Sequence, residues 1–408
     1  EARALLGVAE GALRPRLGSA ASYERLRLSE RFPVLEDFID RGRIDEDQSL
    51  FSAGFDASWE IDLFGGTRRS VEAATAGLES RAAERRDVLL TEVAETARSY
   101  FALRGAQARL AALESSVAAQ RSIVAAARDR LDAGLGSGVD VRRAEGDLQA
   151  LRARLPGERA TAVAAALRLS VLTSIDAASL WARLADAPAA SLPAVPSTTV
   201  PVGLPGNLLR RRPDVRAAER AAQAASASIG VAVAELYPSF SLTGRAGVAA
   251  SDFADLFASE SLTWSIGPGL RWPIFQGGRI RATIEVEEAR HEQALLEYRR
   301  VVRAAVADVE TSLTRYALAR RAHDRLVEAA ATRRAPLRLA RRAYEDGLSA
   351  IDPLLDTRRG LAATETRVAS SRESLLVALA SLNKALGGGW PVRAAGPRPG
   401  ERNDAPRG

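Results

Sequence analysis

Apolar and polar residues alternate with a period of two in several long stretches of the chain. In residues 51–63, "FSAGFDASWEIDL", every odd position is apolar and every even position is polar or glycine. Residues 239–248 and 264–274 alternate in the same way, and residues 17–28 do so less regularly. This period is that of a β-strand with one apolar face, so the pattern predicts four strands. They are expected to form two β-hairpins, 17–63 and 239–274.

Such strands also occur, half-buried, in soluble β-sandwiches. The strands predicted here are longer than the usual strand of about 5–6 residues, and about 9–11 residues are what a tilted strand needs to cross a bilayer. Four strands cannot close a membrane barrel, since single-chain barrels begin at about eight, and an open edge is not viable in lipid. The pattern therefore favours a membrane barrel that several copies of the chain share.

The alternation also predicts which side chains of these strands face lipid and which face water. The set expected to meet lipid is Phe55, Trp59, Leu270 and Trp272. The set expected to meet lumen water or the rim of the barrel is Asp56, Glu60, Asp62 and Arg271.

Much of the remaining sequence has heptad spacing. No proline interrupts residues 66–131, in which an apolar residue recurs every seven positions at Leu103, Leu110, Val117, Val124 and Leu131. At ~1.5 Å per residue this is a helix of roughly 100 Å. A strict heptad predicts left-handed supercoiled packing.

Similar rows run through three further stretches, 141–169, 302–344 and 354–382. Each long helix is expected to return through a tight turn, at 132–140 in one case and at 345–353 in the other. Proline is expected to kink two of the helices, at Pro156 and Pro336. The helical hairpins predicted in this way are 66–172 and 279–386.

The whole arrangement occurs twice. "GVA" at 7–9 matches "GVA" at 230–232 with an offset of 223, whereas Gly65 and Gly66 match Gly277 and Gly278 with an offset of 212. The first copy therefore carries about 11 extra residues, which we place in 32–50. The predicted organisation is a first repeat at 1–173, a Pro-rich equatorial linker at 174–206, a second repeat at 207–386 and a disordered tail at 387–408.

The second repeat opens with a predicted helix, 207–236, of which the first repeat holds only the last part. We therefore expect at least about 20 residues upstream of Glu1 in the complete protein.

Composition excludes several classes of function. The chain has no cysteine and two histidines, so disulfides, thiolate metal sites and histidine clusters are not expected. Its 57 basic and 51 acidic residues give a net charge of +6, but arginines alternate with acids along the helices, which indicates solvated helix faces rather than a nucleic-acid surface. No nucleophile–base pair is evident. The sequence predicts no enzyme activity, no cofactor and no metal.

Four motifs in order carry a family resemblance: "LLRRRPDVRAAE" followed by "IGVAVAELYPSFSLTG", "WPIFQGGRIRA", "DAGLGSGVDVRRAE" and "AYEDGLSAIDPLLDTRRGL". Together they resemble outer membrane efflux proteins of the TolC superfamily, in particular the OprM and NodT type of lipoprotein channel. The resemblance covers residues 1–387 almost completely.

This resemblance implies a homotrimer in which each protomer gives four strands to one twelve-stranded barrel in the outer membrane, while its helices form an α-barrel in the periplasm. It also implies a periplasmic membrane-fusion adaptor and an inner-membrane RND transporter as partners, and drugs or other small solutes as cargo. Relatives of this type are anchored by a lipid on an N-terminal Cys. Such an anchor is expected here from the resemblance alone.

Two groups of residues follow as candidate sites. The turns between the helices are predicted to dock the adaptor through Gly134, Leu135, Ser137, Gly347, Leu348 and Ser349. The resemblance also implies a ring of Asp356 at a closed periplasmic gate, with further gate candidates in Asp352, Arg359 and Tyr344.

Three alternatives remain open from sequence. A type I secretion channel for peptides belongs to the same superfamily. A periplasmic coiled-coil adaptor explains the heptads but leaves the two copies of Trp-containing strands unexplained. A soluble enzyme with helical arms lacks any catalytic constellation.

Overall fold

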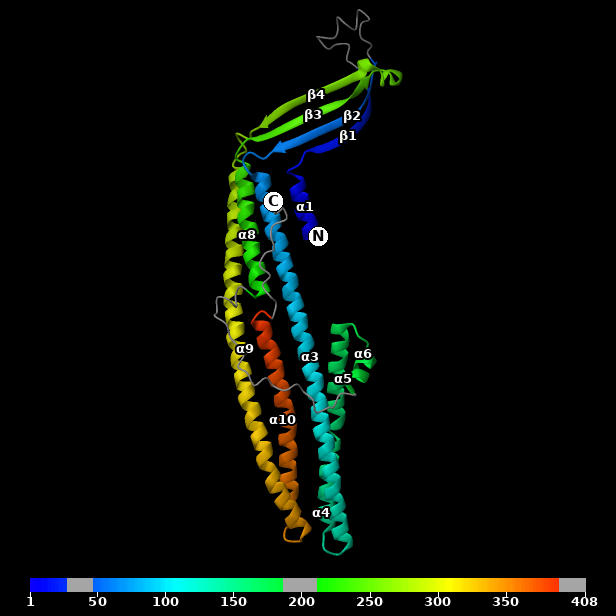
Figure 1. Cartoon of the computed structure of the whole chain (residues 1–408), viewed down its shortest axis with the longest axis vertical. Coiled ribbons are helices and arrows are strands. Elements are labelled where there is room, and N and C mark those ends of the chain that lie inside the picture. Colours follow the sequence, from blue (N-terminus) through cyan, green and yellow to red (C-terminus); the bar gives the residue numbers. More distant parts are fainter. Residues whose placement is uncertain (28–46, 186–210, 389–408) are drawn as a thin grey trace, which may run out of the picture. The chain divides into compact units, whose positions relative to one another are not determined.

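The computed structural model describes residues 1–27, 47–185 and 211–388, and Figure 1 shows the chain coloured along its sequence. These residues form long helices and one antiparallel sheet. In chain order the elements are α1 (Ala2–Gly11), β1 (Arg16–Arg27), β2 (Asp47–Ile61), α3 (Gly66–Asp132), α4 (Gly138–Arg152), α5 (Leu155–Thr173), α6 (Ala177–Ala185), α8 (Pro213–Ala234), β3 (Ser239–Ala250), two short 3-10 helices (Phe253–Asp255 and Ser259–Ser261), β4 (Leu262–Arg271), α9 (Arg279–Glu345) and α10 (Asp352–Ala385).

The chain divides into two compact units, which are not the two sequence repeats. One unit consists of residues 1–83 and 217–300, and the other of residues 84–216 and 301–408. Each unit therefore takes a segment from both repeats, and the long helices α3 and α9 contribute residues to both units. The sequence pattern suggested two structural halves, but the contacts join equivalent parts of the two repeats instead.

The four predicted strands form a single antiparallel sheet with the order β1-β2-β3-β4 (Figure 1). The pairing of β2 with β3 joins the first repeat to the second, since Phe55 lies opposite Ala246. Ala246 in turn lies opposite Trp264 of β4. The outer edges of β1 and β4 have no neighbouring strand among the described residues.

Two long helices of equal length dominate the helical part. α3 and α9 each have 67 residues. A left-handed glycine lies directly before each of them, Gly65 with φ +84° and Gly278 with φ +85°. By its place directly before the helix and its backbone angle, Gly65 corresponds to Gly278, one residue away from the sequence match to Gly277.

The two prolines act differently. Pro156 lies in the first turn of α5, and the helix is interrupted between α4 and α5 rather than kinked. A proline is well tolerated in a first turn, where its missing N–H has no partner to lose. α9 continues through Pro336.

Helix α6 lies inside the range that we expected to be a linker, and it packs beside α5. Its Leu180 joins Leu103 of α3 and Leu169 of α5 in a buried cluster, and this apolar contact explains why the segment is helical. Residues 32–46 of the predicted insertion at 32–50, the Pro-rich segment 191–206 and the tail from 389 onward lie outside the described residues, whereas residues 47–50 begin β2.

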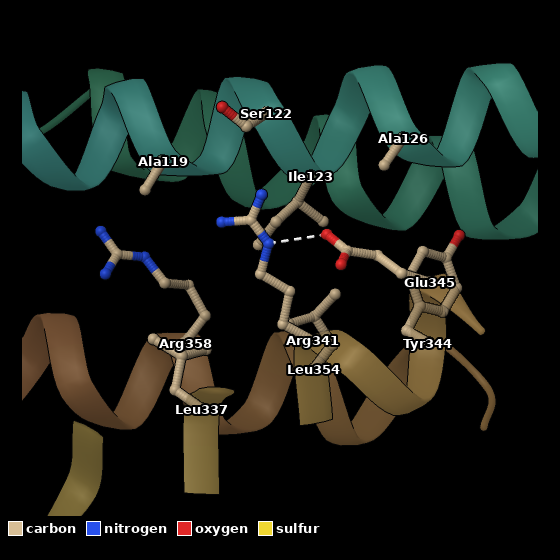
Figure 2. A pocket seen from close by; sticks show the side chains of 10 residues that line it. All are labelled: Ala119, Ser122, Ile123, Ala126, Leu337, Arg341, Tyr344, Glu345, Leu354 and Arg358. Carbon is tan, nitrogen blue, oxygen red and sulfur yellow. Dashed lines mark hydrogen bonds and ion pairs between the residues drawn. The ribbon is translucent and has the colours of Figure 1, made fainter. Parts of the chain in front are cut away.

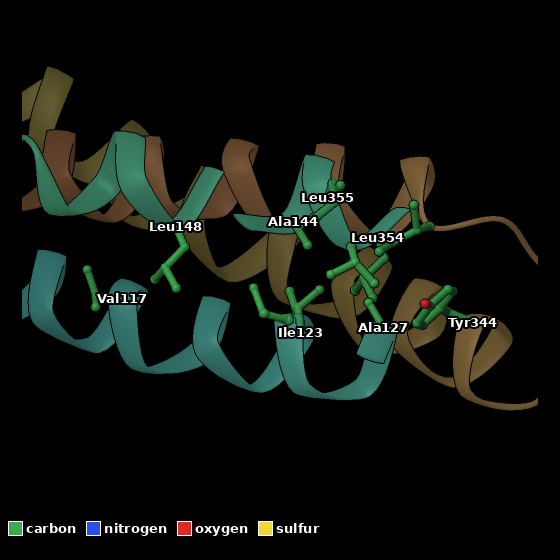
Figure 3. Close-up of a cluster of buried hydrophobic side chains, with 11 residues drawn as sticks. Val117, Ile123, Ala127, Ala144, Leu148, Tyr344, Leu354 and Leu355 are labelled. Carbon is green, nitrogen blue, oxygen red and sulfur yellow. The ribbon is translucent and has the colours of Figure 1, made fainter. Parts of the chain in front are cut away.

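The largest buried cluster lies where the two helical hairpins meet. It combines side chains of α3, α4, α9, α10 and the residue before α10 (Figure 3). Its members are Val117, Ile123, Val124, Ala127, Val141, Ala144, Leu148, Tyr344, Ile351, Leu354 and Leu355. Burial of such side chains contributes about 1.5–3 kcal/mol each, so this cluster is what holds the hairpins together.

A charged network adds a further connection between helices. Arg109 of α3 forms ion pairs with Glu158 of α5 and Glu373 of α10. Burial alone would lower the pKa of Arg109, but the hydrogen bonds with the two carboxylates outweigh this effect and raise it. Among the described helices, none is long and apolar enough to cross a membrane.

Candidate functional site

β2, β3 and β4 present apolar side chains on one face of the sheet, whereas β1 does so only in part, with Ser19 opposite Phe55. Phe55, Ala246 and Trp264 form one row across β2, β3 and β4, and Trp59, Leu242 and Pro268 form another. The face is exposed, since Phe55 and Trp264 keep 61% and 73% of their surface accessible. Soluble monomers rarely expose continuous apolar surface of this extent, so the face is suited to an apolar environment.

The opposite face of the sheet is polar. Asp56 of β2 lies opposite Arg245 of β3, and both side chains are exposed. Glu60 and Arg271 lie on the same face by the alternation of the strands. Asp62 lies one residue beyond β2, and its side chain is only 12% exposed, so of the two expected environments it does not meet open water.

The Asp62 side chain instead stabilises the first turn of α3. Its carboxylate accepts hydrogen bonds from the backbone N–H groups of Thr67 (3.2 Å) and Arg68 (2.8 Å), and it pairs with the Arg68 side chain. A carboxylate in this position satisfies N–H groups that have no partner within the helix.

Two of the four predicted lipid-facing residues form hydrogen bonds with backbone groups at the ends of helices. The indole N–H of Trp59 donates to the backbone oxygen of Leu13 (3.1 Å), just after α1. The indole N–H of Trp272, one residue beyond β4, donates to the backbone oxygen of Leu236 (3.3 Å), just after α8. These equivalent bonds occur once in each repeat. Phe55 and Leu270 project from the strands without such a bond and are 61% and 63% exposed.

The turn after α3 is a tight helix-terminating motif. Gly134 has φ +74° and donates its N–H to the oxygen of Leu131 (2.9 Å). The next N–H, of Leu135, donates to the oxygen of Arg130 (2.8 Å). This pair of bonds is the Schellman motif, which requires a left-handed residue at the glycine. Ser137 then begins α4 by accepting a hydrogen bond from the N–H of Val139.

The turn after α9 repeats this geometry. Gly347 has φ +77° and donates to the oxygen of Tyr344 (3.1 Å), and Leu348 donates to the oxygen of Ala343 (2.8 Å). The leucine in this motif usually packs back on its own helix. Here Leu135 and Leu348 are 69% and 81% exposed instead. Ser349 donates from its hydroxyl to the oxygen of Ala350.

Arg130 links the two turns. Its guanidinium donates to the backbone oxygen of Tyr344 (2.9 Å) and to that of Leu135 (3.3 Å), and it lies 4.9 Å from the centre of the Tyr344 ring. The Tyr344 ring is 3% exposed and belongs to the buried cluster (Figure 3). Burial raises the pKa of its hydroxyl. Tyr344 therefore contributes packing and a backbone acceptor across the hairpins.

The predicted gate residues form two ion pairs between α4 and α10. Arg143 donates to both carboxylate oxygens of Asp352 (2.8 and 2.9 Å). Arg359 donates to Asp147 (2.8 Å) and also to Asp356 on its own helix (3.0 Å). The structure thus brings Asp356 and Arg359 together, while Asp352 has a separate partner.

These pairs are weak enough to be broken. The Arg143 and Asp352 side chains are about half exposed, and so is that of Arg359. Exposed ion pairs contribute about 0–1 kcal/mol each because solvent and salt screen them. The hydrogen bond with Asp147 raises the pKa of Arg359, which is consistent with a permanently charged link. These ion pairs between the hairpins can therefore exchange with water, unlike the buried cluster beside them.

Comparison with known proteins gives this geometry its context. The sequence profile of the outer membrane efflux protein family matches residues 1–174 and 204–388. The chain belongs to that family. It is an outer membrane component of an efflux system.

Two curated relatives illustrate the family. The solvent efflux pump outer membrane protein SrpC of Pseudomonas putida is 30% identical over 388 residues, which cover 90% of this chain and 80% of SrpC. Nodulation protein T of Rhizobium leguminosarum bv. trifolii is 32% identical over 343 residues, covering 83% of this chain and 72% of the relative.

Solved channels of the family share the fold. The outer-membrane channel OprN has a TM-score of 0.82 at 30% identity. The match covers 95% of this chain and 85% of the OprN chain. The open state of the Neisseria gonorrhoeae MtrE channel has a TM-score of 0.77 at 27% identity, with coverage of 95% and 83%. These matches confirm the fold class expected from the sequence.

Three functional candidates in this efflux protein were missed from sequence: Arg130, Arg143 and Asp147. Arg143 and Asp147 stand one helical turn apart in "RRAEGD", which was a visible signal of an ion-pairing face. Their partners on α10 depend on how the hairpins pack, so the sequence alone did not select them.

Proposed function

We propose that three copies of this chain form one efflux channel, with a barrel of twelve strands built from three four-stranded sheets. The observation that carries the proposal is the sheet itself, which has an exposed apolar face, most complete on β2, β3 and β4, and two edges without a neighbouring strand in the described chain. In lipid such edges must be paired. Symmetric copies pair β1 of one protomer with β4 of the next.

The channel serves a tripartite system, with a periplasmic membrane-fusion adaptor and an inner-membrane RND transporter as partners. Relatives named for solvent efflux and for cation efflux support small solutes as cargo, in preference to the peptides of a type I secretion duct. The exposed leucines of the two turns supply the surface for the adaptor. The aspartates of α10 line the periplasmic gate.

The copy number is the first test. The purified chain in detergent should have the mass of three protomers by light scattering corrected for bound detergent, because three sheets of four strands make an even-numbered closed barrel. A monomer that retains all of its β structure in detergent would contradict the proposal.

The lipid-facing side of the strands is testable with one matched pair. Phe55→Arg should destabilise the barrel in vesicles by about 2–4 kcal/mol, because arginine is costly at mid-membrane lipid positions. Ser58→Arg, on the polar face of the same strand, should unfold like the parent in a urea titration. An equal cost for both variants would show that our assignment of the two faces is wrong.

The docking surface is tested by the double variant Leu135→Asp and Leu348→Asp, which leaves both turn glycines in place. Burial of two leucines in an interface contributes about 1.5–3 kcal/mol each, so adaptor affinity should fall by about tenfold or more. Val171→Asp is the control, since Val171 is exposed to the same 81% as Leu348. Co-purification of the double variant with the adaptor at the parental level would count against docking at the turns.

Asp147 and Asp356 have different proposed roles at the gate, one as a link between helices and one as a charge near the axis. Conductance in a planar bilayer can distinguish them. Asp147→Asn removes a link between α4 and α10, so it should raise conductance. Asp356→Ala leaves that link but removes an exposed carboxylate that would occur three times around the axis, so it should weaken cation preference. If both properties stay at the parental values in both variants, the gate lies elsewhere.

A further inference from the structure

Arg358 of α10 is a buried cation without a counter-charge. It is 7% exposed, and its Nε atom has no hydrogen-bond partner. It forms no ion pair with any residue in the described part of the chain, whereas its neighbour Arg359 pairs with two carboxylates. Burial lowers the pKa of Arg358, with only a partial opposing effect from Glu365. A guanidinium in this situation favours any anion that can reach it.

The guanidinium reaches into a pocket between the two helical hairpins. Figure 2 shows Arg341 and Arg358 extending toward the part of α3 that carries Ala119 and Ser122. The pocket has a cavity volume of about 80 Å³ and is partly open to solvent. A small molecule in this position contacts α3 on one side and α9 and α10 on the other.

The charges around the pocket leave one positive charge uncompensated. Arg341 is paired with Glu345 (2.7 Å), as the dashed line in Figure 2 marks. Arg358 has no such partner. On its other side Arg358 lies near Asp147 and Arg154, but Asp147 is already paired with Arg359.

Most of the remaining wall is apolar. Ile123 of α3 and Leu337, Tyr344 and Leu354 of the second hairpin line the pocket, while the hydroxyl of Ser122 donates to the backbone oxygen of Ala118. A single cation beside apolar walls selects a ligand with one negative charge on an apolar body. A divalent inorganic anion lacks the apolar body, and a neutral aromatic molecule lacks the charge.

We propose that this pocket binds a small organic monocarboxylate, whose carboxylate pairs with Arg358 and whose apolar part lies against Ile123 and Leu337. The bound carboxylate supplies the counter-charge that the chain itself does not provide. Because the site is bounded by both hairpins, the ligand also adds a contact between them. Binding at this site is separate from conduction and can be measured without transport.

The test uses the purified full-length chain in a neutral detergent at pH 7, with benzoate as the probe. Benzoate should raise the melting temperature of the parent and give a saturable isotherm by calorimetry. Benzyl alcohol, which has the ring without the charge, and sulfate, which has charge without the ring, should bind at least about tenfold more weakly, because a charge-assisted hydrogen bond or the apolar contact is lost.

Arg358→Met is the decisive variant, because it keeps a long side chain and removes the charge. Without ligand it should melt above the parent, since an unpaired buried charge has been removed. Its benzoate affinity should fall about tenfold or more. Arg367→Met, at an exposed position of the same helix, should bind benzoate like the parent.

Three results would overturn the proposal. One is equal benzoate affinity in Arg358→Met and the parent. Another is sulfate binding as tight as benzoate binding, which would indicate a general anion site. The third is loss of the oligomer in Arg358→Met, which would show that an acidic group of a second copy is the counter-charge.

Discussion

The backbone N–H and C=O groups along the outer edges of β1 and β4 have no partner strand within the described chain, and in hydrocarbon each unpaired group costs several kcal/mol. A sheet with an exposed apolar face therefore cannot enter a membrane as a single copy. In the proposed trimer, closure between copies would satisfy both edges at once, and this accounts for the four strands of each chain.

The helical part combines a strong contact with several weak ones. The buried cluster around Leu148, Ile351 and Leu355 holds the hairpins together through apolar burial. Exposed ion pairs such as Arg143–Asp352 are individually weak. This combination fits the proposed gate, because water can replace the ion pairs while the core stays packed. Arg358 is the exception, since it is charged and buried at the border of that core.

The two repeats make equivalent contacts, but they do not form two separate structural halves. Trp59 and Trp272 make equivalent indole hydrogen bonds, and Gly134 and Gly347 end their helices in the same way. Yet the strands of the two copies pair with each other, so that each compact unit is built from both copies. The two copies have diverged where they meet the partner hairpin: α4 carries Arg143 and Asp147, whereas α10 carries Asp352 and Arg359.

The sequence by itself determined the strands, the long helices and both turns. Period-two alternation, heptad spacing and the turn glycines are local signals, because each depends on the backbone geometry of one element. Only the tertiary structure decided that Asp62 stabilises a helix start, that 177–185 is a helix, and that Asp147 is the partner of Arg359 across the hairpins. These outcomes depend on which faces of distant segments meet, and a pattern along one segment does not specify its partner. For the same reason the sequence did not distinguish Arg358 from its neighbour Arg359, although the two differ in burial and in ion pairing.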